Sequence, residues 1–345
     1  MSRALWLAAA LVLSLPALIS GWSLAGSALF LVEFLSEGRW RPLSAITPAV
    51  SARPLPSSAG GRAIPIDLYT RASFARAPGL VLVHGLAQRG KDDPRLREAA
   101  SLLARDGWAV AVPTVEGLTV LRLRPDDAVA VIAAVRGLEQ AGYRPVAILA
   151  VSLGAGPALL AAADPSVASS VSAVLALGGY ASVVELLRYT LTGAYRFDGI
   201  GGRRPVNEPA IAEFARANAE LVDGAGGRLV GNRDPQALDR LVAELPPGVR
   251  QLLAALSPEN HLGRLRAPLF LIHGRDDPAV PFTESLRLER AARAAGRPAR
   301  TVIVGSLGHV EPELRAGPRD LLRLWMGFYA FRVASCRLTS AGRGS

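Results

Sequence analysis

An apolar run, a serine and a stretch of small residues follow one another directly in the middle of the chain. Residues 146–151 are apolar and partly β-branched, which favours a buried strand, and residues 155–163 are rich in alanine, which favours a helix. Ser152 lies between them, with Ala150 and Gly154 two residues away on either side. A tight turn here needs small side chains at those positions and holds the serine at strained backbone angles, as in a nucleophile elbow. The alternative is an ordinary strand-to-helix turn that happens to contain a serine.

Apolar runs and helical stretches alternate on both sides of this serine. The expected strands are residues 80–83, 108–112, 146–151, 172–177, 268–274 and 301–304. Asp93 and Pro94 suit the start of a helix that ends near Gly107, and residues 125–141 predict another helix. We therefore expect an α/β fold with a mostly parallel sheet and helices on both of its faces.

The order of the polar residues points to nucleophilic chemistry. A serine hydroxyl is a poor nucleophile unless a base removes its proton and an acid orients that base. Asp276 and Asp277 lie in the loop after the strand at 268–274, and His309 lies in the loop after the strand at 301–304. Serine, acid and histidine thus each follow a predicted strand, at the sheet edge where parallel sheets place their chemistry.

This constellation resembles the α/β-hydrolase superfamily over roughly residues 62–335. Within it, the chain looks closest to serine esterases and dienelactone-hydrolase-like members, although the latter typically carry cysteine where this chain has Ser152. The resemblance implies an α/β-hydrolase fold and selects Asp277 as the acid, because the family's acid usually stands in an Asp-x-x-Val-Pro pattern. It also implies an oxyanion hole formed by the backbone N–H groups of Leu86, which follows His84 and Gly85, and of Leu153.

The expected activity is hydrolysis of small-molecule carboxylic esters, of the EC 3.1.1 type, through Ser152, Asp277, His309 and an acyl-enzyme intermediate. A peptidase, a lipase or an acyltransferase on the same triad stays open, because the substrate is not encoded in these motifs. A catalytically silent, membrane-anchored binding module is the rival from a different class. The sequence leaves the oligomeric state open.

Other kinds of site are not predicted. His84 and His273 each end a strand before glycine and are expected to be structural, and His261 lies in a polar turn. Neither the histidines nor the single Cys336 have the spacing of a metal site, so we expect no metal and no cofactor. The net charge of +10 comes from scattered arginines, with Lys91 the only lysine, and no aromatic-interleaved basic patch indicates a nucleic-acid partner. This composition is typical of a GC-rich bacterial source.

The domain organisation follows from where the alternation stops. Residues 62–179 and 263–335 are expected to form the catalytic core, and residues 336–345 a flexible tail. Between them, residues 180–262 show helical, irregular patterning with no convincing strand, which predicts a helical cap inserted over the active site. The alternative is a group of surface helices away from the site.

The amino-terminal region is predicted to contact a membrane. Ala4 to Val32 is an uncharged run of 29 residues, long enough to cross a bilayer, so residues 1–36 are expected to be a retained anchor, in the bacterial inner membrane. A signal peptide cleaved near Ala25, giving a secreted or periplasmic protein, and a core-packed helix are the alternatives. Residues 37–61, rich in proline, serine and alanine, are expected to be a linker.

Overall fold

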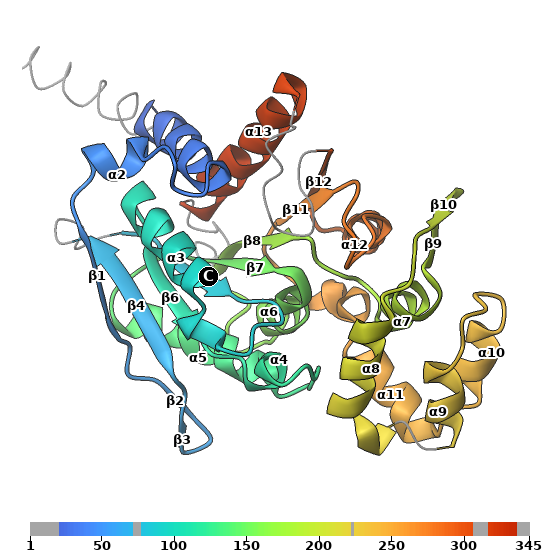
Figure 1. The fold of residues 1–345 in the computed structure, drawn as a ribbon. Helices are drawn as coiled ribbons and strands as arrows, with labels where there is room; N and C mark the ends of the chain where they lie inside the picture. The colour runs from blue at the N-terminus through green and yellow to red at the C-terminus, as the bar shows by residue number, and fades with distance from the viewer. Residues whose placement is uncertain (1–20, 72–76, 222–223, 306–316, 337–345) are drawn as a thin grey trace, which may run out of the picture.

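An eight-stranded sheet runs through the centre of the computed structural model, which describes residues 21–71, 77–221, 224–305 and 317–336 (Figure 1). The strand order is β1-β4-β6-β5-β7-β8-β11-β12; β4 is antiparallel to both of its neighbours and the other pairs are parallel. The strands are β1 (Val50–Pro54), β4 (Ile66–Arg71), β5 (Gly79–Val83), β6 (Ala109–Pro113), β7 (Val146–Val151), β8 (Val171–Leu177), β11 (Leu269–Gly274) and β12 (Ala299–Val304). The expected mostly parallel α/β fold is confirmed.

Helices cover both faces of this sheet, and successive strand residues face opposite layers. In β5, Val81 and Val83 pack in one core and Leu80 and Leu82 in the other. The first core is covered by α5 (Asp127–Gln140), α6 (Ala155–Ala162) and α12 (Thr283–Ala294). The second is covered by α3 (Pro94–Asp106), α13 (Pro318–Ser335) and a helix over residues 21–35. Because both faces of the sheet are covered at its centre, strands such as β5, β6 and β7 read as continuous apolar runs.

The ends of α3 show why the local sequence predicted this helix correctly. The Asp93 side chain accepts a hydrogen bond from the Arg95 N–H, and Pro94 occupies the first helical position. Gly107 ends the helix in the left-handed region, with φ of 117°. Short elements complete the core: α4 (Glu116–Thr119), the hairpin of β2 (Ser58–Ala59) and β3 (Arg62–Ala63), and the 3₁₀ turns η1 (Gly90–Asp92) and η4 (Pro258–Arg264).

After β8 the alternation stops, as expected, and the chain forms an insertion of short helices. They are α7 (Val183–Thr192), α8 (Glu208–Ala217), η3 (Ala219–Leu221), α9 (Ala225–Val230), α10 (Leu238–Ala243) and α11 (Pro247–Ala255). The expectation of no strand here is wrong, because β9 (Ala194–Phe197) and β10 (Ile200–Arg203) form a hairpin. Its turn is Asp198-Gly199, with φ of 52° and 77°. Asp-Gly between apolar residues is a hairpin signal, so the sequence did carry this information.

Residues 37–61 differ from the expected linker. They contain α2 (Pro42–Ile46) and β1, and β1 pairs along β4 from Val50 opposite Arg71 to Pro54 opposite Asp67. The sheet therefore begins inside this segment. Four of the five β1 residues are exposed, as befits an edge strand, so β1 lacks the apolar run that marks the buried strands.

The helix over residues 21–35 packs against the body of the protein. Phe30 stacks on Phe328 of α13 with ring centroids 4.7 Å apart, and the Trp325 indole N–H donates to the Ser27 hydroxyl at 3.0 Å. In the described part of the chain, no helix has both the length and the apolar character that crossing a bilayer requires. The first seventeen residues of the uncharged run, 4–20, and all of the expected tail except Cys336 lie outside the described residues.

Candidate active site

Ser152 occupies the tight turn that its sequence predicts. It directly follows β7, begins the 3₁₀ turn η2 (Ser152–Gly154) and leads into α6. Its φ is 53°, in the left-handed region that residues with a side chain rarely adopt, and it is 6% exposed. A strained backbone at a serine on a strand-to-helix turn is the geometry of a nucleophile elbow, and it persists only where surrounding structure enforces it.

The loop after β5 supplies that enforcement by direct backbone contact. A β-carbon added to Gly154 would lie 2.2 Å from the carbonyl oxygen of His84. A β-carbon on Gly85 would lie 2.9 Å from the Ser152 Cβ and 3.1 Å from the Val151 carbonyl oxygen. Neither approach leaves room for a side chain, which is why glycine is needed at both positions. The turn at Ser152 and the loop that begins at Gly85 are therefore packed together.

Leu86 and Leu153, whose N–H groups are the expected oxyanion donors, lie on these two packed segments. Leu86 follows Gly85 and is 44% exposed, so it is not part of the apolar core. Leu153 follows the serine and is partly buried against the sheet core and against an apolar cluster that includes Tyr180 and Val183. The two amides thus belong to adjoining backbone segments beside Ser152.

His84 holds the loop after β5 to the loop after β6. Its Nε2 accepts a hydrogen bond from the Val115 N–H at 3.0 Å, so its Nδ1 carries the proton and donates to the Gly85 carbonyl at 2.7 Å. Burial lowers the pKa of His84 below its usual 6.5, which keeps the ring neutral. These contacts agree with the structural role expected for this histidine.

Asp277 is buried after β11, whereas its neighbour Asp276 faces solvent. One Asp277 carboxylate oxygen accepts from the N–H groups of Ala279 and Val280, at 2.8 and 2.9 Å. The side chain of Asp276 is 74% exposed and pairs with Arg204. Burial and fixed orientation suit Asp277, rather than Asp276, to orient a base.

His273 lies next to this carboxylate, and the sequence analysis did not predict the contact. Its Nε2 is 3.4 Å from the other Asp277 oxygen and donates to the Val280 carbonyl at 2.9 Å. Its Nδ1 is 2.7 Å from the Ser285 hydroxyl, and the ring is fully buried. His273 therefore fixes both ends of the 277–280 turn. No sign of this contact is present in the sequence other than the short separation of four residues between His273 and Asp277.

The third predicted residue, His309, falls in residues 306–316, outside the described part of the chain. Ser152 and Asp277 follow β7 and β11, and β8 lies between these two strands in the parallel part of the sheet. β12 runs parallel to β11 and ends at Val304, opposite Gly274. The chain thus leaves the sheet toward His309 from the same edge that carries Ser152 and Asp277.

The insertion is attached to the core at two places along that edge. On the acid loop, the Tyr189 hydroxyl donates to the carbonyls of Asp277 and Pro278, at 3.3 and 3.2 Å, and burial raises the Tyr189 pKa to about 12, so it remains a donor. On the loop after α4, the Asn218 amide donates to the Leu121 carbonyl at 3.1 Å. These loops follow β11 and β6, and the strands that lead to Gly85 and Ser152 lie between them. The insertion therefore bridges the candidate site.

The first and last turns of the insertion are fixed by buried polar groups. Glu284 of α12 accepts hydrogen bonds from the N–H groups of Ala181 and Ser182, both at 2.9 Å, and burial raises its pKa. The Tyr180 hydroxyl donates to the Leu256 carbonyl at 3.0 Å, which joins the two ends of the insertion. The insertion is thus anchored to the same helix, α12, whose Ser285 contacts His273.

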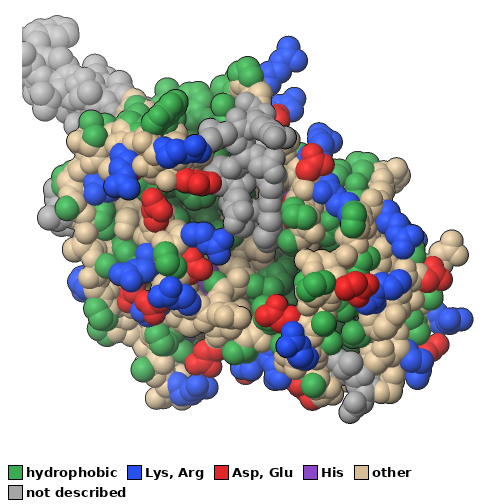
Figure 2. Space-filling model, in the orientation of Figure 1, with side chains coloured by type: hydrophobic (Ala, Val, Ile, Leu, Met, Phe, Trp, Pro, Cys, Tyr) green, Lys and Arg blue, Asp and Glu red, His purple; other side chains and the backbone are tan. Residues whose placement is uncertain are grey.

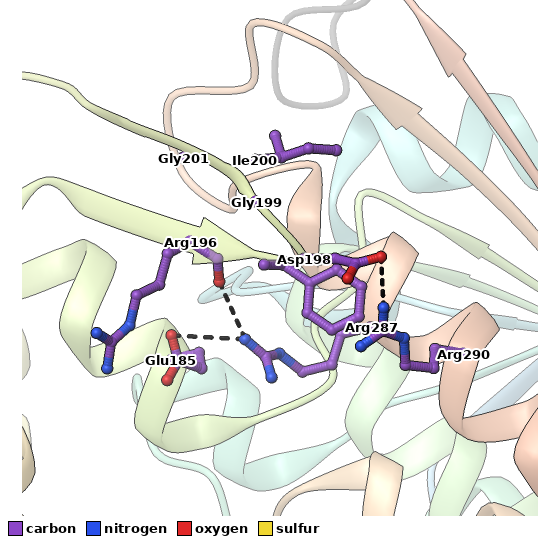
Figure 3. Close-up of a pocket in the computed structure, with 9 residues that line it drawn as sticks. Glu185, Arg196, Asp198, Gly199, Ile200, Gly201, Arg287 and Arg290 are labelled. Atoms are coloured by element: carbon purple, nitrogen blue, oxygen red, sulfur yellow. Dashed lines mark hydrogen bonds and ion pairs between the residues drawn. The ribbon is translucent and has the colours of Figure 1, made fainter.

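A separate open pocket of about 640 Å³ lies between the β9–β10 hairpin, α7 and α12 (Figure 3). Arg287 and Arg290 lie over the Phe197 ring, 4.8 and 4.5 Å from its centroid. Arg287 also pairs with Glu185 at 3.6 Å, and Arg290 pairs with Asp198. The charged side chains of this pocket are paired within the molecule, and none of the residues that line the pocket is a predicted site residue.

The described residues offer no group of three or more histidine, cysteine or carboxylate side chains that could hold a metal ion. Cys336, the single cysteine, is exposed and is a free thiol.

Solved structures that align with this chain include peptidases of low sequence identity, and no family model matches the chain. An acylaminoacyl peptidase from Pyrococcus horikoshii aligns with a TM-score of 0.58 and 17% identity, over 86% of this chain and 44% of its own. A puromycin-hydrolysing peptidase from Mycobacterium tuberculosis aligns with a TM-score of 0.57 and 19% identity, over 84% and 40%. This chain therefore spans less than half the length of these peptidases. At such identity the likeness shows the α/β-hydrolase fold, which is the fold expected from the sequence.

Proposed function

We propose that this chain, which has the α/β-hydrolase fold, is a serine hydrolase that cleaves carboxylic esters. The observation that carries the proposal is the backbone of Ser152: a φ of 53° at a strand-to-helix turn packed against Gly85. Strain of this kind costs about 1–3 kcal/mol and is retained where function needs the residue presented in that way. The buried Asp277 at the same sheet edge supports the proposal further.

The proposed mechanism uses Ser152, His309 and Asp277 in the roles that their chain order suggests. His309 takes the proton from the Ser152 hydroxyl as its oxygen attacks the ester carbonyl, and Asp277 stabilises the resulting imidazolium. The N–H groups of Leu86 and Leu153 receive the oxyanion, each contributing about 3–4 kcal/mol of transition-state stabilisation. Collapse expels the alcohol, which takes its proton from His309. Water, activated by His309, then attacks the acyl-enzyme and releases the acid.

A second candidate is hydrolysis of an amide bond by the same residues. It is favoured by the two solved structures above, whose names describe peptidases acting on acylaminoacyl groups and on puromycin. Ester and amide hydrolysis share the acylation step and differ in the leaving group. The insertion, which bridges the candidate site, is the part of this chain expected to decide between them.

Labelling with a fluorophosphonate tests the nucleophile directly. We expect the wild-type chain to be labelled, the Ser152→Ala variant to lose the label, and the Ser166→Ala variant, changed at an exposed serine whose hydroxyl bonds to Asp164, to keep it. A wild-type chain that is folded yet unlabelled would favour the silent binding module. A panel of p-nitrophenyl esters beside an acyl-amino-acid anilide then separates the two substrate classes. Turnover of the anilide alone would overturn the ester proposal and leave the nucleophile in place.

A further inference from the structure

We propose that one end of the folded body docks onto the surface of a lipid bilayer, independently of the catalytic role of Ser152. This end consists of Trp22 and Leu24 on the helix over residues 21–35, and of Leu321, Leu322 and Met326 on α13; we call it the apolar end. The contribution of the folded body, and of α13 in particular, is distinct from any membrane contact made by residues 4–20.

The two helices contact each other and run in the same general direction, which places these five side chains on one flank of the body. Ser27 contacts Trp325 and Phe30 stacks on Phe328, so both contacts join residues 298 positions apart. Figure 1 shows the two helices side by side on one flank of the molecule. The residues that precede these two contacts in each helix therefore lie on the same flank of the body.

The apolar end is exposed although the same helices bury other large side chains. Trp22, Leu24, Leu321, Leu322 and Met326 are 36–54% exposed, whereas Phe30, Leu324 and Phe328 on the inner faces are at most 5% exposed. Eight of the twelve exposed large hydrophobic side chains of the described residues lie in 21–46 and 318–335. Figure 2 shows hydrophobic side chains gathered over this flank. Single exposed apolar residues are ordinary, but a cluster of this kind marks an interaction surface.

Three features favour lipid as the occupant. The uncharged residues 4–20 enter the described structure at residue 21, which is at the apolar end. Arg319 and Arg323 are exposed on the first turns of α13, where basic side chains attract anionic headgroups, although Arg323 also pairs with Asp320 at 3.8 Å. Trp22 adds an indole, which prefers the boundary between headgroups and hydrocarbon.

A second copy of the chain fits this end less well than a bilayer does. In a two-fold dimer both copies would bring Arg319 and Arg323 to the same interface, where like charges repel, and Asp320 beside them is already engaged by Arg323 and the Gly305 N–H of its own chain. Docking through this end also leaves the insertion free, because α8–α11 lie on the far side of the sheet from the helix over residues 21–35 (Figure 1). Substrate access to the candidate site is therefore compatible with membrane docking.

A single fluorescent probe distinguishes docking of the body from anchoring by residues 4–20 alone. The full chain carries Cys336→Ser, so that Leu322→Cys provides the one thiol for a nitrobenzoxadiazole dye. We expect vesicles of phosphatidylcholine and phosphatidylglycerol to shift its emission to the blue, and doxyl-labelled lipid to quench it. The same dye on Ile200→Cys, which is 43% exposed on the β9–β10 hairpin, should remain unquenched.

The outcomes decide the proposal. A chain that binds vesicles while the dye at position 322 stays unquenched would mean that the body does not touch lipid. A chain that does not bind vesicles, or that forms a dimer by light scattering with the position-322 dye shielded in the absence of lipid, would also overturn it.

A charge placed in the apolar end tests the energetics. We expect the Leu321→Glu/Leu322→Glu variant to bind the vesicles on the order of tenfold or more weakly, because two apolar side chains are replaced by anions facing an anionic surface. The matched control is Val129→Glu, an exposed apolar position on α5, which should leave vesicle affinity unchanged. Equal affinity for all three chains, with unchanged circular dichroism, would contradict docking through this end.

Discussion

Gly154 approaches His84 so closely that a single methyl group would collide: a β-carbon on the glycine would lie 2.2 Å from the histidine carbonyl oxygen. This contact joins the turn that presents Ser152 to the loop that carries Leu86. Because the contact is between two backbones, neither side can relax by rotating a side chain. The proposed nucleophile and its oxyanion donors are therefore positioned relative to each other by the main chain.

Replacing Gly154 with alanine should separate these two segments. We expect Gly154→Ala to lose about 100-fold or more in kcat/KM, since displacements near 1 Å can cost that much, and to lower stability by at least 1–3 kcal/mol through overpacking. Ester hydrolysis and urea unfolding measure the two effects. Gly248→Ala is the control, because its β-carbon meets nothing within 4 Å, and it should be neutral or slightly stabilising. Wild-type activity in Gly154→Ala would show that the contact is unimportant.

His273 is expected to act as a positioning residue for Asp277. In His273→Gln, the 277–280 turn loses a rigid ring that reaches both the Val280 carbonyl and the carboxylate. We expect kcat to fall about 10–100-fold with KM nearly unchanged, because the acid would orient the base less well. Ser285→Ala, which removes only the partner of Nδ1, should have a smaller effect. A fall in stability with kcat and its pH profile unchanged would assign His273 a purely structural role.

His84 should make the fold sensitive to mild acid. Its pKa is lowered by burial, so the unfolded chain takes up a proton near pH 6.5 before the folded protein does. The stability that neutral His84 contributes is complete above pH 6.5 and is lost below it, by up to about 1.4 kcal/mol per pH unit until the folded pKa is reached. Urea unfolding of wild type and His84→Gln between pH 8 and 5 measures this difference. Parallel stability profiles for the two proteins would rule out the effect.

Arg204 is expected to couple the insertion to the acid loop. Its guanidinium donates to the carbonyl oxygens of Asp276 and Arg275, at 2.6 and 3.0 Å. Arg204→Met should lower stability by about 1.5–3 kcal/mol and alter both kcat and KM, since it removes charge-assisted bonds to the loop that carries Asp277.

The control for Arg204 comes from the same insertion. Arg228→Met breaks an exposed pair with Glu244 that does not touch the acid loop, and should cost less than about 1 kcal/mol. Equal effects of the two substitutions on activity would contradict coupling through Arg204.

The fold was predictable where a segment's own pattern decides its structure. Residues 146–151 and 80–83 are buried on both sides and read as strands, and Asp93, Pro94 and Gly107 bound α3 through local hydrogen bonding and backbone geometry. β1 was missed because it is an exposed edge strand, whose pairing with β4 depends on residues beyond its own sequence. The β9–β10 hairpin was missed although Asp198 and Gly199 gave a usable signal.

The candidate site was predictable as far as motifs with fixed local geometry go. Ser152 and Asp277 stand at strand ends, so a strand pattern suffices to find them. The contact of His273 with Asp277 requires the turn at 277–280 to fold back on β11. The attachment of Tyr189 and Arg204 to that loop joins residues more than 70 positions apart, which no local pattern encodes.

The pairing of the helix over residues 21–35 with α13 also has a consequence for biosynthesis. Ser27 and Phe30 emerge from the ribosome first, but their partners Trp325 and Phe328 are made 298 residues later. At ~5–20 residues per second, the interval is on the order of 15–60 s. Throughout that time Phe30 lacks its α13 partner. The helix over residues 21–35 is thus made early but is among the last of the described elements to complete its packing.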